Sequence, residues 1–209
     1  MKKPALFLFF IHIHFFLLAQ STTPESRSSL QFNFGRSFNG TGDISGFQYG
    51  LTFAKSLGKK TYWSVGFEGT LHDDERTTST FDDGEGNTFE SKSRYVTGGI
   101  QLVGNFGYDF IKNFKHAFGL SVGPLIRYQS SSIPDSRSTL FPIVTDLPFP
   151  VERTEYTNPF RTIALGAVLK LNYYYTFDSN FMLGLTGGFQ TDTNGDTISY
   201  LSLGFGKRF

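Results

Sequence analysis

Apolar and polar residues alternate with a period of two along most of this chain. The clearest example covers residues 47–57. Its apolar members are Phe47, Tyr49, Leu51, Phe53 and Leu57, and its small or polar members are Gln48, Gly50, Thr52, Ala54 and Ser56. Successive side chains of a β-strand point to opposite faces, so this pattern predicts a strand whose two faces meet different surroundings.

The same alternation predicts eight strands. They cover residues 30–38, 47–57, 62–72, 94–108, 117–128, 163–175, 181–190 and 198–209. The turns after the second, fourth and sixth strands are short. The other connections are longer or polar, and we expect external loops at residues 37–46, 73–93, 130–158 and 191–197. An even strand number with this asymmetry is typical of outer-membrane barrels. Pro124 lacks a backbone donor and predicts a bulge in the fifth strand.

The orientation of the two faces follows from their sizes. The apolar face is rich in Phe, Leu, Tyr, Val and Ile, and aromatic residues make up 17% of the chain. Eight strands enclose too little space for large aromatic side chains from every strand. The sequence therefore predicts an all-β fold, an eight-stranded antiparallel up-and-down transmembrane β-barrel with its apolar face toward lipid. The aromatic residues expected in the interfacial girdles are Tyr49, Tyr62, Trp63, Tyr108, Tyr128, Tyr173, Tyr175 and Phe209.

The N-terminus is typical of a cleaved signal peptide over residues 1–19. Lys2 and Lys3 precede an apolar run over residues 5–18, and Ala19 marks a cleavage point. A transmembrane anchor is the alternative, but the run is short for a membrane span. Residues 20–209 are then the barrel domain.

Composition excludes several other classes. The chain has no cysteine, which rules out disulfides, thiolate zinc sites and an acylated cysteine. A net charge of +1 gives no reason to expect nucleic acid. We expect no cofactor and no metal site: the acidic residues 82–87 are interpreted as a solvated loop, with weak cation bridging to lipopolysaccharide as the alternative. Residues 192–196 contain Asn-Gly and are interpreted as a hairpin turn.

With its signal peptide, eight alternating strands and terminal aromatic, the chain resembles the small outer-membrane β-barrel families of the OmpA/OmpX type over residues 30–209. In those families the last strand carries an assembly signal that alternates back from a terminal aromatic. Leu201, Leu203, Phe205 and Phe209 match this pattern, whereas Lys207 departs from it. The resemblance implies a location in the bacterial outer membrane, contact with its lipid and lipopolysaccharide, and recognition of the last strand by the barrel-assembly machinery.

A polar network is predicted inside the barrel from the inward positions of Glu68, Gln101, Arg127 and Lys170. A charge inside a small barrel is tolerated when it is paired. We expect Glu68 to pair with Arg127 across the bore, and Lys170 to meet water or backbone carbonyls. His72 lies four residues from Glu68, a distance of roughly 13 Å along a strand, so Glu68 cannot orient it directly.

Three functions are compatible with this architecture. A structural or surface-interaction role is favoured, because a bore of this size usually fills with side chains. A narrow pore is the first alternative, suggested by the many inward Gly, Ser and Thr residues. A lipid-modifying enzyme that uses His72 with a serine is the second, although no catalytic residue is assigned. The apolar loop at residues 130–158 is predicted to cap the barrel mouth or to bind an extracellular partner.

Overall fold

The computed structural model describes residues 27–40, 44–82, 86, 88–132, 136–147, 150–156 and 159–209. The predicted signal peptide, residues 1–19, lies outside the described residues, as does most of the acidic segment 82–87. Within the described ranges, no helix is long and apolar enough to cross a membrane.

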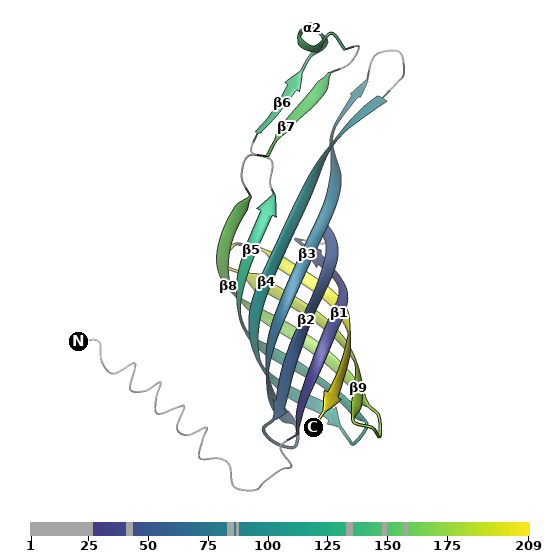
Figure 1. Ribbon diagram of the computed structural model, residues 1–209, viewed down its shortest axis with the longest axis vertical. Helices are drawn as coiled ribbons and strands as arrows, with labels where there is room; N and C mark the ends of the chain where they lie inside the picture. The colour runs from purple at the N-terminus through teal and green to yellow at the C-terminus, as the bar shows by residue number, and fades with distance from the viewer. Residues whose placement is uncertain are drawn as a thin grey trace, which may run out of the picture.

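Eight antiparallel strands close into one barrel, as predicted (Figure 1). Around the ring they are β1 Ser28–Asn39, β10 Thr197–Arg208, β9 Phe181–Asp192, β8 Phe160–Thr176, β5 His116–Ser132, β4 Thr88–Lys112, β3 Thr61–Asp82 and β2 Ile44–Ser56. The first and last strands pair from Ser29–Arg208 to Asn39–Ile198. This pairing removes both free sheet edges, so every strand of the ring has a partner on each side.

The prediction of loops at residues 73–93 and 130–158 was wrong in part. β3 and β4 continue as a paired hairpin as far as Asp82–Thr88, far above the barrel (Figure 1). A second hairpin follows β5; it is made of β6 Ser136–Leu140 and β7 Val151–Glu155, with the short helix α2 Pro142–Thr145 between them. Both faces of a strand above the membrane meet water, so the alternation that marks a spanning strand is lost while the backbone ladder continues.

The predicted bulge at Pro124 was also wrong. The register of β4 against β5 is the same on both sides of the proline, and the shift lies at Asp109/Ile111 instead. The two strands approach closely beside Pro124: a Cβ atom added to Gly123 would lie 1.7 Å from the carbonyl oxygen of Gly104. Two glycines without side chains therefore let the strands pass the proline in register.

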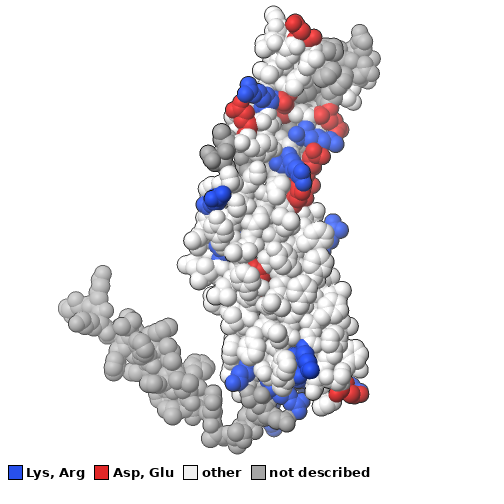
Figure 2. Space-filling model, in the orientation of Figure 1, with Lys and Arg blue, Asp and Glu red and all other residues white. Residues whose placement is uncertain are grey.

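The apolar face is turned outward and the polar face inward, as expected for a membrane barrel. Phe32, Phe67, Leu102, Leu171 and Leu203 are all at least 45% exposed, and the buried side chains are mostly polar. Figure 2 shows few charged side chains over the middle of the visible face and clusters of them toward both ends. An uncharged aromatic band between two polar ends suits the hydrocarbon core of a bilayer.

Candidate functional site

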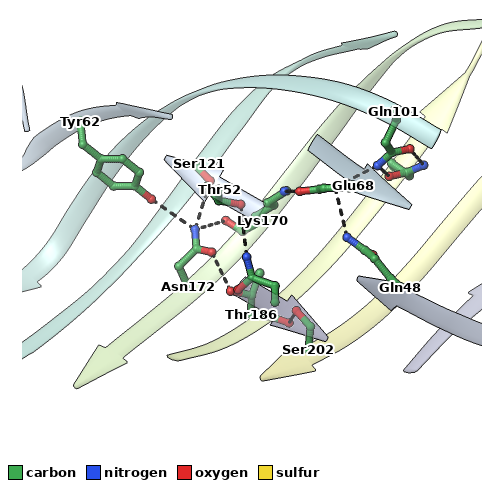
Figure 3. A network of polar contacts seen from close by, with 12 residues as sticks. Gln48, Thr52, Tyr62, Glu68, Gln101, Ser121, Lys170, Asn172, Thr186 and Ser202 are labelled. Atoms are coloured by element: carbon green, nitrogen blue, oxygen red, sulfur yellow. Dashed lines mark hydrogen bonds and ion pairs between the residues drawn. The ribbon is translucent and has the colours of Figure 1, made fainter. Parts of the chain in front are cut away.

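Glu68 of β3 is the centre of the polar network in the lumen (Figure 3). One carboxylate oxygen forms an ion pair with Lys170 of β8, and both side chains are less than a tenth exposed. The other oxygen accepts hydrogen bonds from Gln48 Nε2 at 3.1 Å and Gln101 Nε2 at 2.9 Å. Donors from three other strands therefore converge on one buried carboxylate, which satisfies its charge.

The predicted pairing of Glu68 with Arg127 was wrong, and so was the expectation that Lys170 meets only water or backbone. Arg127 donates from Nη2 to Thr70 Oγ1 at 3.2 Å. Its guanidinium leans over Gly99, where an added Cβ atom would lie 2.8 Å from Arg127 Nε. This missing side chain lets Arg127 turn toward the hairpin end of the barrel, so the carboxylate is left to the long lysine that reaches across from β8.

A second group of hydrogen bonds lies around Asn172 of β8 (Figure 3). Its Nδ2 donates to Tyr62 Oη at 3.2 Å and to Ser121 Oγ at 3.1 Å. Its Oδ1 accepts from Tyr174 Oη at 3.3 Å and Thr186 Oγ1 at 3.1 Å. Asn172 thus joins side chains of four strands into one network, and sequence reasoning did not select it.

Three tyrosines point into the lumen, and Tyr62 is one of them, so its placement in the outer girdle was wrong. Each tyrosine lies across the strand pair from a glycine whose missing side chain makes room for the ring. The pairs are Tyr62–Gly107, Tyr174–Gly184 and Tyr200–Gly188, and a Cβ atom added to the glycine would lie 2.2, 2.6 and 2.1 Å from the ring. A tyrosine at an inward position opposite a glycine was the signal that could have revealed this packing.

The lumen above Glu68 is filled by side chains. Gln101 and Gln190 exchange amide hydrogen bonds of 2.8 and 2.9 Å across the bore. Arg127, His72 and Ser37, which lie nearer the hairpin end, are all 0% exposed. Side chains of the described strands therefore close the barrel between its two ends, as a small bore normally requires.

Among the described residues, Ser37 Oγ and His72 Nε2 form a serine–histidine hydrogen bond of 2.9 Å. Both side chains are completely buried, and His72 Nδ1 has no hydrogen-bond partner in this part of the chain. The neighbouring Asp73 faces outward and pairs with Arg94. A nucleophile needs a base oriented by a third group and a path for the substrate, and this pair lacks both.

The two hairpins above the barrel contact one another. Ser91 Oγ of β4 donates to Glu152 of β7 at 2.7 Å, and Tyr156 Oη donates to the carbonyl oxygen of Arg94 at 2.9 Å. The tip around α2 is apolar and exposed: Phe141, Ile143 and Val144 are 58%, 92% and 70% exposed. The prediction of an apolar segment at residues 130–158 thus corresponds to a raised tip, and its predicted role as a cap over the barrel mouth was wrong (Figure 1).

Leu203, Phe205 and Phe209 lie on the outer face of the closing strand or at its end, with exposures of 52%, 46% and 65%. They share that face with Lys207, which pairs in register with Leu30 of β1. Recognition of these residues by an assembly machinery stays a prediction.

No protein-family model matches this sequence, and no curated protein matches it. Solved structures do match. Ail, the attachment invasion locus protein of Yersinia pestis, is similar at 11% identity and a TM-score of 0.50, over 89% of this chain and 100% of that chain. This chain has the fold of a small outer-membrane β-barrel. Neisserial surface protein A (NspA) is also similar at 11% identity and a TM-score of 0.50, over 88% of this chain and 97% of that chain. The predicted fold is thereby confirmed, and with the apolar belt it indicates the predicted outer-membrane location.

In outer-membrane barrels the short turns face the periplasm and the longer connections face outward. The short turns lie at the end of the barrel that holds Ser28 and Phe209; they cover residues 57–60, 113–115 and 177–180. We therefore call this end periplasmic and the hairpin end extracellular.

Proposed function

We propose that this protein is an integral outer-membrane barrel with a surface-interaction role, and that the tip of the β6–β7 hairpin makes the contact. The observation that carries the proposal is the exposure of Ile143 and Val144, at 92% and 70%. Apolar side chains gathered at an exposed tip usually mark an interaction site, because leaving them in water is unfavourable. The contact between the hairpins supports a defined position for this tip.

The charge of the extracellular segments limits the chemical class of partner that this protein can bind. Residues 73–94 carry seven acidic and three basic residues, and residues 130–158 carry four acidic and two basic ones. One structure of Ail holds the heparin analogue sucrose octasulfate. A surface with this excess of carboxylates repels such a polyanion, so we propose a partner with an apolar contact surface and a positive rim.

The filled lumen favours this role over a pore, and the buried Ser37–His72 pair gives no support to a lipid-modifying enzyme. We also propose that the aromatic belt contacts outer-membrane lipid and lipopolysaccharide, and that the closing strand is recognised by the barrel-assembly machinery. These contacts would insert the barrel and hold the raised hairpins outside the cell.

The tip is tested with bacteria that display the full chain. Adhesion to alkyl-coated, cationic and heparin-coated surfaces is compared for the wild type, an Ile143→Ser/Val144→Ser variant and a Thr139→Ala control in the same hairpin. We expect the double variant to lose adhesion to the alkyl-coated surface, while the control retains it. Equal adhesion of the double variant and the wild type, at equal surface amounts, would contradict the proposal.

The pore alternative is tested by reconstitution into planar bilayers. We expect no single-channel openings across replicate insertions of the purified full chain. Regular openings that disappear on a lumen-filling substitution such as Ser64→Phe would establish conduction instead.

A further inference from the structure

The periplasmic half of the lumen holds a cavity of about 140 Å³ that opens at the short-turn end and is separate from the raised hairpins. Its inner end is the Glu68–Lys170 ion pair, seen from close by in Figure 3. Its wall is made of amides, hydroxyls and tyrosine rings, among them Gln31, Asn105, Ser121, Asn172, Tyr174 and Tyr200. The cavity is therefore a blind pocket that faces the periplasm and that offers hydrogen-bonding groups beside apolar surface.

The pocket is large enough for a small solute. A cavity of about 150 Å³ in another protein holds a molecule as large as benzene, and the volume here, about 140 Å³, is similar. A short polyol, of the size of glycerol, fits this space.

The wall offers hydrogen-bonding groups that the protein does not use. Gln31 Oε1 and Asn105 Oδ1 have no hydrogen-bond partner among the described residues, although their side chains are only 4% and 6% exposed. Asn33 Oδ1, on the same wall, is likewise buried without a partner. Buried polar groups are normally satisfied. An amide can present either its oxygen or its NH₂ group, and a hydroxyl, which both donates and accepts, is the ligand group that suits it in either orientation.

The charge of the pocket lies at its mouth. Four basic residues line the periplasmic opening, Arg27, Lys55, Lys112 and Arg208, and Lys112 pairs with Asp109 at 3.0 Å. The Glu68–Lys170 pair at the inner end is neutral as a unit. A ligand therefore meets neutral hydrogen-bonding groups in the pocket and more basic than acidic side chains at the entrance, where Arg208 favours a phosphate.

We infer that this pocket binds a short polyol that carries a phosphate group, with the hydroxyls toward Gln31 and Asn105 and the phosphate at Arg208. The shared chemistry is that of glycerol phosphate. It is available as a free periplasmic solute and as the headgroup of an anionic phospholipid.

The test is calorimetric titration of the purified full chain in zwitterionic detergent with glycerol, inorganic phosphate and glycerol 3-phosphate. We expect glycerol 3-phosphate to bind at least about tenfold more tightly than either fragment, because only it uses both parts of the pocket. No binding of glycerol 3-phosphate would overturn the inference. Equal binding of inorganic phosphate and glycerol 3-phosphate would also overturn it, since the deep amides would then contribute nothing.

Two neighbouring lysine and arginine positions provide a matched control. Arg208 lines the pocket, whereas Lys207 lies on the outer face of the same strand. We expect Arg208→Gln to weaken glycerol 3-phosphate binding about tenfold and Lys207→Gln to leave it unchanged. Equal losses in both variants would show a diffuse attraction at the rim and overturn the assignment.

A larger side chain in the wall of the pocket tests whether glycerol 3-phosphate binds inside it. Ala54 lines the wall, and Ala54→Phe is expected to abolish binding of glycerol 3-phosphate; Ala54→Leu replaces it if the larger side chain prevents folding. Unchanged binding in a folded, filled variant would overturn the inference. Nanodiscs distinguish the two sources: loss of binding in phosphatidylglycerol relative to phosphatidylcholine identifies the lipid headgroup, and equal binding identifies the free solute.

Discussion

Substituting one member of the Glu68–Lys170 pair tests how much this buried ion pair contributes to the stability of the barrel. In Lys170→Met the carboxylate keeps its hydrogen bonds from Gln48 and Gln101 but loses its counter-charge. Breaking a buried pair in this way costs about 3–5 kcal/mol. The pocket on the periplasmic side lets water approach, and two amide donors remain. We therefore expect Lys170→Met to lower the free energy of unfolding by about 3 kcal/mol, the lower end of that range.

Glu68→Gln leaves the lysine without a carboxylate and is expected to cost a similar amount, about 3 kcal/mol. The double variant buries no charge, so its cost is expected to fall short of the sum by about 2–3 kcal/mol. The measurement is urea unfolding of the refolded barrel in phospholipid vesicles, with the denaturant slope compared among the variants. Additive losses, within about 0.5 kcal/mol, would refute the view that the two side chains act as one neutral unit.

Two further predictions concern the packing of the barrel and its extracellular edge. Gly188→Ala places a methyl group 2.1 Å from the ring of Tyr200 and is expected to lower the free energy of unfolding by about 1–3 kcal/mol in the same urea assay. In the outward control Gly187→Ala the methyl group lies 4.0 Å from its nearest neighbour, and we expect a change within about 0.5 kcal/mol. Equal losses in the two variants would contradict the packing of Tyr200 over Gly188. The hydrogen bond from Arg94 lowers the pKa of Asp73, so its small contribution is present at neutral pH and lost as the pH falls. Arg94→Gln should raise that pKa in an NMR titration, and an unchanged titration would contradict the pairing.

The membrane-spanning strands could be predicted from the sequence because lipid and lumen impose opposite demands on alternate residues. The alternation over residues 47–57 lies within β2, Ile44–Ser56, almost to the residue. Above the membrane both faces meet water, so nothing in the pattern marked the continuation of β3 beyond His72. The hairpin turn over residues 192–196 could be predicted without any alternation, because the pair Asn-Gly itself favours a tight turn. Gly195 in this turn has a positive φ of 82°.

The lumen network was harder to predict than the strands. The inward position of Glu68 followed from the alternation, but its partner depends on which side chain reaches across the closed ring. Arg127 was the reasonable choice by charge, and Gly99 beside it diverted the guanidinium toward Thr70. Whether Glu68 pairs with Arg127 or with Lys170 depends on the space that Gly99 leaves beside Arg127. The position of Gly99 beside Arg127 is known only when the register of the strands is known.

The outward orientation of the apolar face is the central claim, and the native chain carries its own probe. Trp63 is the single tryptophan. It lies on the outer side of β3, with its ring centroid 5.6 Å from that of Phe53. Fluorescence of the full chain refolded in vesicles is measured with lipids brominated near the headgroup and with aqueous iodide. We expect strong quenching of the Trp63 fluorescence by the brominated lipid and little quenching by iodide. Strong quenching by iodide with none by brominated lipid would contradict it.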